Sequence, residues 1–101
     1  MLERRPEDTR LRFGLALEYL SARRLEEGVR ELRAYLDASD DEGNTWGRLG
    51  NALRELGRED EAREAYSLGV EAAYRHGHPT MAGEFEEALK DWDRQRGSDG
   101  D

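Results

Sequence analysis

Apolar residues recur along most of this chain at the spacing of one face of an α-helix. Between residues 46 and 53, apolar and small side chains stand at i, i+3, i+4 and i+7. Gly57 interrupts this pattern, and the same period resumes over 62–70. The segment 46–74 therefore predicts a helical hairpin whose two apolar stripes face each other around the small residue Gly50.

The same periodicity predicts three more helices. The expected helices span about 6–22, 25–38, 45–56, 60–75 and 80–94. Asn44 or Thr45 is expected to cap the third helix, because short polar side chains accept hydrogen bonds from the first free amides. Gly77 suits the end of the fourth helix, and Pro79 suits the start of the fifth.

The first expected helix differs from the others because it is apolar on two sides. One stripe includes Leu11 and Leu15, and the other includes Phe13, Leu17 and Leu20. A helix with two apolar sides needs two partners, or one partner and a ligand.

The hairpin at 46–74 resembles a tetratricopeptide repeat (TPR). The residues that fit the family's pattern are Trp46, Leu49, Gly50, Ala62 and Tyr66. The family's period is about 34 residues, and a shift of that length aligns these positions with a second set. This set is Arg12, Leu15, Ala16, Gly28 and Leu32, in which Arg12 departs from the expected Trp.

The resemblance implies an all-α fold: two TPR-like antiparallel helix hairpins plus a C-terminal capping helix, in a right-handed α–α superhelix. A compact helical bundle is the alternative fold. We expect a loose N-terminus and helix start at 1–8, repeats at 9–42 and 43–76, a capping helix at 77–94 and a disordered tail at 95–101. The fifth helix lacks a following partner, so it is expected to close the last open face. It could instead be half of a truncated repeat, which would make the chain a fragment.

The composition agrees with a thin stack of helices. The chain is 36% hydrophobic and 40% charged, with a formal net charge of −8, and stacked repeats bury only a narrow core. Disordered chains lack this ordered apolar period. The basic residues are not clustered, which disfavours nucleic-acid binding. The composition leaves open whether the acidic, arginine-rich usage reflects a GC-rich genome or a salt-adapted cytoplasm.

The sequence offers little for catalysis or metal binding. There is no cysteine, and the pair His76 and His78 lacks a third ligand at a suitable spacing. No nucleophile arrangement or phosphate-binding glycine loop is present. We therefore expect no enzyme activity, cofactor or metal. No apolar run approaches the length of a membrane span, so we expect no membrane association and a cytoplasmic location.

The resemblance implies that the chain is a TPR-type adaptor, a protein–protein interaction module that holds a peptide or helix of an unidentified partner in a partly apolar concave groove. In the family, the first helix of each pair lines this groove. The implied groove residues are Arg10, Phe13, Leu17, Leu20, Asn44, Asn51, Arg54, Met81 and Phe85. Asn51 could hydrogen-bond a peptide backbone, and Arg54 could pair with an acid. Members that clamp a terminal carboxylate have Lys and Asn where this chain has Phe13 and Leu17, so no such clamp is expected.

Two alternatives stay open at this point. Phe13 and Phe85 could touch across the small stack and fill the groove themselves. The chain could also be a self-associating structural module, a homodimer formed through the apolar groove or through the capping helix with Phe85 and Trp92.

Overall fold

The computed structural model describes the backbone of residues 6–99 and the side chains of residues 9–95. Five α-helices make up almost all of this part: α1 (Pro6–Ser21), α2 (Leu25–Ala38), α3 (Asn44–Glu55), α4 (Glu59–Arg75) and α5 (Pro79–Asp99). The expected helices are confirmed, with one difference at the C-terminal end. Helix α5 continues to Asp99, so it overlaps most of the tail expected at 95–101. The rest of that tail and residues 1–5 of the expected loose N-terminus lie outside the described residues.

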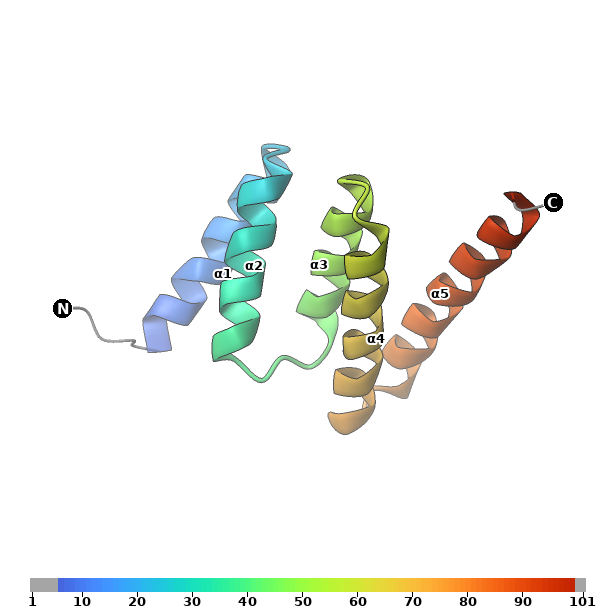
Figure 1. Ribbon diagram of the computed structural model, residues 1–101. Coiled ribbons are helices and arrows are strands. Elements are labelled where there is room, and N and C mark those ends of the chain that lie inside the picture. Colours follow the sequence, from blue (N-terminus) through green and yellow to red (C-terminus); the bar gives the residue numbers. More distant parts are fainter. Residues whose placement is uncertain (1–5, 100–101) are drawn as a thin grey trace.

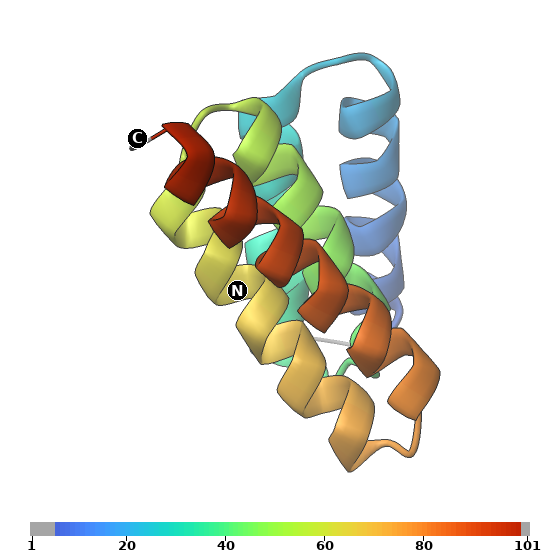
Figure 2. The same cartoon turned by 90° about the vertical axis from the view of Figure 1, so that its right-hand side faces the viewer.

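The helices are arranged as a row of hairpins. Helices α1 and α2 form one antiparallel hairpin, α3 and α4 form the next, and α5 packs against α4 (Figure 1). The two hairpins are joined through contacts between α2 and α3. Turned by 90°, the molecule shows α5 lying over the α3–α4 hairpin and running alongside α4 (Figure 2). Among the described residues, the second hairpin is therefore flanked on both sides, whereas the first has a neighbouring helix on one side only.

Three turns in the chain share one backbone conformation. Arg23, Gly57 and Gly77 have φ angles of 64°, 81° and 78°. The amide that follows each of them donates to a carbonyl five residues earlier, over 2.8, 2.9 and 2.7 Å. This hydrogen bond satisfies a carbonyl at the end of the preceding helix. The first turn uses Arg23 in a left-handed conformation that glycine adopts at lower cost.

The start of α3 is capped by a residue that the sequence did not indicate. The amides of Gly43 and Thr45 both donate to Asp41 Oδ2, over 2.8 and 2.9 Å. The expected Asn or Thr cap is therefore wrong, and Thr45 is instead buried. The physical reason is the φ of 126° at Gly43, which folds the linker so that the Asp41 carboxylate reaches both free amides.

The core runs along the row of helices but thins toward α1. Leu32, Leu49 and Leu53 are its largest fully buried apolar side chains. Gly50 faces the Tyr66 ring, where an added Cβ would lie 3.0 Å from Cε1. This confirms that a small residue is needed where α3 and α4 cross. Of the α1 side chains that the structure describes, only Ala16 is buried.

Candidate functional site

The first helices of the two hairpins form one layer of the molecule. Helices α1 and α3 lie behind α2 and α4 in Figure 1, and the rotated view agrees (Figure 2). The sequence-derived groove residues belong to this layer and to α5. They fall into three groups that differ in where they lie and in what they contact.

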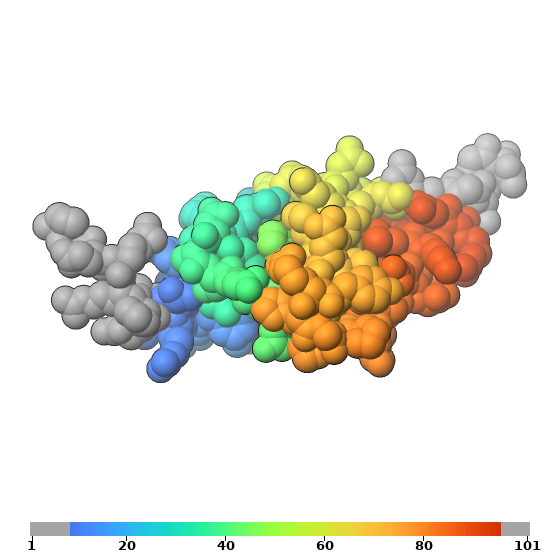
Figure 3. Space-filling model, turned by 90° about the horizontal axis from the view of Figure 1, so that it is seen from below, coloured from blue at the N-terminus to red at the C-terminus, as the bar shows by residue number. Residues whose placement is uncertain are grey.

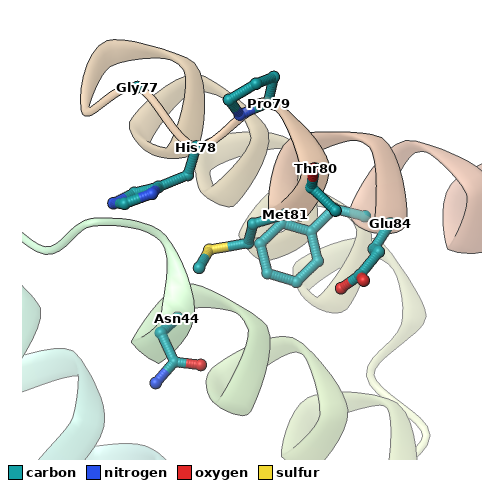
Figure 4. A pocket seen from close by; sticks show the side chains of 8 residues that line it. Asn44, Gly77, His78, Pro79, Thr80, Met81 and Glu84 are labelled. Atoms are coloured by element: carbon teal, nitrogen blue, oxygen red, sulfur yellow. The ribbon is translucent and has the colours of Figure 1, made fainter.

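The first group gathers at a pocket of about 470 Å³ between the starts of α3 and α5. Asn44 comes from α3, while His78, Met81, Glu84 and Phe85 lie in and after the turn that leads into α5. Figure 4 shows the Met81 side chain reaching between the imidazole of His78 and the amide of Asn44. Three of the nine sequence-derived groove residues, Asn44, Met81 and Phe85, are therefore brought together here.

Polar side-chain contacts hold one edge of this pocket. His78 Nε2 lies 2.9 Å from Glu42 Oε1, and Asp40 lies 3.2 Å from both His76 and Arg75. These contacts join the α4–α5 turn to the α2–α3 linker, and the space-filling view shows the two segments side by side (Figure 3). The hydrogen bonds from His76 and then Arg75 hold the pKa of Asp40 below its usual value. The negative form of Asp40 is thus the one that this edge stabilises.

Phe85 lines the pocket only in part, because its ring enters the α3–α4 hairpin. A Cβ added at Gly47 would lie 2.7 Å from Phe85 Cε1, and one added at Gly69 would lie 3.0 Å from Cε2. The Phe85 and Tyr66 ring centroids are 6.0 Å apart. Two glycines therefore leave the space that Phe85 fills, and this contact attaches α5 to the hairpin.

The second group, Asn51 and Arg54, is engaged within the chain. Asn51 Oδ1 accepts a hydrogen bond from the Tyr66 hydroxyl. Arg54 lies over the Trp92 ring at 4.5 Å from its centroid. Burial raises the pKa of Tyr66, and the nearby Arg54 charge partly offsets that effect. The groups expected to meet a ligand thus already have partners in this structure.

The third group, on α1, lies apart from the pocket. The Phe13 and Tyr35 ring centroids are 5.1 Å apart, and Leu20 packs beside Gly28, while Leu17 is half-buried and Arg10 is exposed. Helices α1 and α5 lie at opposite ends of the row (Figure 1). Phe13 therefore pairs with a ring of its own hairpin and Phe85 with a ring of the second hairpin, and the two do not fill a groove between them.

Three further apolar residues matter for the site and were not among the groove residues derived from the sequence. Trp92 is only 4% exposed and packs against Tyr66, with centroids 6.1 Å apart, so it is not part of a free surface on the capping helix. Leu11 and Leu15 are instead exposed. The two-sided pattern of the first helix was the signal that could have marked them.

The described residues show neither a metal site nor a membrane span. No three of their His, Cys, Asp or Glu side chains are grouped so that they could hold a metal ion. Among these same residues, every helix is too short or too polar to cross a bilayer.

Comparisons with known proteins identify the fold. No protein-family model matches the chain, and no curated protein matches it in sequence. A solution NMR structure of a tetratricopeptide repeat domain protein from Salinibacter ruber has a TM-score of 0.74 and 28% identity, covering 86% of this chain and 89% of that chain. A crystal structure of a tetratricopeptide repeat domain protein from the same organism has a TM-score of 0.69 and 26% identity, covering 81% and 92%.

The stacked hairpins define a helical-repeat protein. The chain is similar in fold to these tetratricopeptide repeat domains, and the resemblance and the all-α repeat fold inferred from the sequence are confirmed. Such a fold is typically a non-catalytic scaffold for protein–protein interaction.

Proposed function

We propose that this chain is a protein–protein interaction module that holds a short peptide segment of its partner at the pocket between α3 and α5. The observation that carries this proposal is the convergence of Asn44, Met81 and Phe85 on a cavity of about 470 Å³. A cavity of this size accommodates one or two side chains of a bound peptide.

The walls of the pocket offer both apolar and polar contacts. Met81 is half-buried, and a flexible thioether adapts to differently shaped apolar groups. The Asn44 side chain is exposed and makes no hydrogen bond to any described residue. Its amide can therefore donate to and accept from the backbone of an extended peptide. A ligand would bury an apolar side chain against Met81 and Phe85 and would hydrogen-bond to Asn44.

Peptide selection followed by affinity measurement tests this function. The full chain is immobilised, peptides are selected from a random phage-displayed library, and fluorescein-labelled copies are measured by anisotropy. We expect Met81→Lys to weaken the selected peptides by roughly tenfold or more, because it places a charge on the apolar wall. Asn44→Ala should weaken them by about fivefold through loss of the amide.

Glu64→Ala is the matched control, since Glu64 is exposed on α4 and does not line the pocket. It should leave affinity unchanged. Asn44 is exposed, so its variant separates a loss of binding from a loss of folding. The proposal is wrong if no peptide is selected, or if the selected peptides bind equally to both pocket variants.

A further inference from the structure

The outer face of α1, by which we mean Leu11, Leu15 and Glu18, is exposed to solvent. Leu11 is 69% exposed and Leu15 is 40% exposed. They stand four residues apart and therefore point the same way from the helix. Gly14 borders this face, and a Cβ added there would meet no atom within 4 Å. An apolar helix surface is thus left open at one end of the row.

The repeat shows what covers this face elsewhere in the same chain. A shift of about 34 residues aligns Leu11 with Thr45 and Leu15 with Leu49, which are each 2% exposed. Helix α2 covers those positions: Leu49 lines a small cavity together with Leu36 of that helix. The equivalent surface in the second hairpin is therefore buried by a helix.

Glu18 determines the chemistry that a docked helix needs. The same shift aligns it with Ala52, which is 4% exposed and lines a small cavity together with Leu25 of α2. Glu18 is exposed and forms no ion pair with a described residue. A helix docked as α2 docks on α3 would approach this carboxylate at the place where α2 presents a leucine. Burying the Glu18 carboxylate under a helix costs free energy unless a cation lies beside it.

The net charge argues that this helix belongs to another protein. The chain carries −8, and a symmetric pair of copies would bring two such net charges together. A basic helix would instead be attracted by the same charges.

We propose that the outer face of α1 docks an amphipathic helix of a partner protein, with apolar residues against Leu11 and Leu15 and a lysine or arginine opposite Glu18. This surface lies on the opposite end of the molecule from the peptide pocket, so the proposal does not depend on that site.

A pair of synthetic helices tests the proposal on the full chain. One probe is a fluorescein-labelled peptide of about 18 residues, with leucines at i, i+3, i+4 and i+7 and lysines beside them. The other probe has glutamates in place of the lysines. Anisotropy should show binding of the lysine peptide to the unchanged protein, and Leu15→Asp should weaken it by roughly tenfold or more.

Charge reversal separates a specific site from general attraction. Glu18→Lys should weaken the lysine peptide by about fivefold and strengthen the glutamate peptide. Glu71→Lys is the matched control, because Glu71 is an exposed acid on α4 and the net charge changes by the same amount. This control should change affinity less than about twofold.

Three results would overturn the proposal. The first is an equal effect of Glu71→Lys and Glu18→Lys, which would indicate non-specific attraction. The second is unchanged affinity in Leu15→Asp, with Leu11→Asp as a second test if the first variant does not fold. The third is a dimer on a sizing column that Leu15→Asp converts to monomer, which would make a second copy the occupant.

Discussion

The two ends of the row of helices differ in how they meet solvent. At the C-terminal end, Phe85 and Trp92 of α5 pack against the second hairpin, while charged residues such as Lys90 and Asp91 are exposed. At the N-terminal end, α1 buries Ala16 and exposes Leu11 and Leu15. This fold therefore needs a closing element at each end, and the described residues supply one at the C-terminal end only.

The largest expected effect comes from removing the C-terminal closure. Trp92→Ala should lower the free energy of unfolding by about 3–5 kcal/mol, because it empties the space beside Tyr66 and Arg54. Leu11→Ala at the other end should change it by no more than about 0.5 kcal/mol, since that side chain is already in solvent. Urea unfolding followed by circular dichroism measures both. Equal losses in the free energy of unfolding would show that Leu11 is packed as closely as Trp92.

A second pair of variants compares the same substitution at the two ends. Gly47→Ala places a methyl group 2.7 Å from Phe85 Cε1, where the ring is held between two glycines, and should cost about 1–3 kcal/mol. Gly14→Ala lies in open space within a helix and should stabilise the protein by about 0.5–1 kcal/mol. Thermal unfolding gives the sign of each change. A loss of stability in Gly14→Ala would mean that the outer face of α1 is covered.

The matching turns of the two hairpins provide a smaller test. Arg23→Gly should stabilise the chain by up to about 1 kcal/mol, because it relieves a left-handed arginine. The change also removes the exposed ion pair of Arg23 with Glu55, which is worth little. Gly57→Ala at the equivalent turn should destabilise it by about 1 kcal/mol. Chemical denaturation of both variants measures the two changes in the free energy of unfolding. A loss of stability in Arg23→Gly would contradict the prediction.

The smallest expected effect concerns the ion pairs beside the pocket. The folded state lowers the pKa of Asp40, so Asp40 contributes stability above its unfolded pKa and loses that contribution as the pH falls through the folded value. Asp40→Asn should therefore unfold at a slightly lower temperature than the unchanged protein at pH 7. The two melting temperatures should converge at acid pH, once Asp40 is protonated in the folded state as well. A difference that persists at low pH would assign the effect to something other than this charge.

Much of the fold could be predicted from the sequence because the apolar period is strong in helices that have two neighbours. Helix α2 was placed at its observed bounds, and the turns at Gly57 and Gly77 followed from glycine's access to positive φ. The cap at Asp41 could not be predicted, since it depends on how the linker folds around Gly43. The length of α5 was also missed, because its last turns are polar and lack the apolar period.

The candidate site could be predicted less well, because a position in a repeat gives the side of a helix but not its contacts. Asn44 and Met81 reach a common pocket. Arg54, in contrast, lies over Trp92, and no pattern in the sequence indicated that the capping helix would extend its tryptophan back to α3. Long side chains in a small stack find partners across neighbouring helices, and those partners are set by tertiary packing.

In the described part of the chain, the most extensive helix–helix contacts join helices that are consecutive in the sequence. No distant segments must find each other first, so the loop-closure entropy that slows folding is small, and we expect folding within milliseconds. The α1–α2 hairpin contacts the rest of the molecule mainly where α2 packs against α3. It can therefore open while the second hairpin stays folded. Hydrogen exchange should therefore proceed in order along the molecule, with the amides of α1 exchanging first and those of α3 and α4 last.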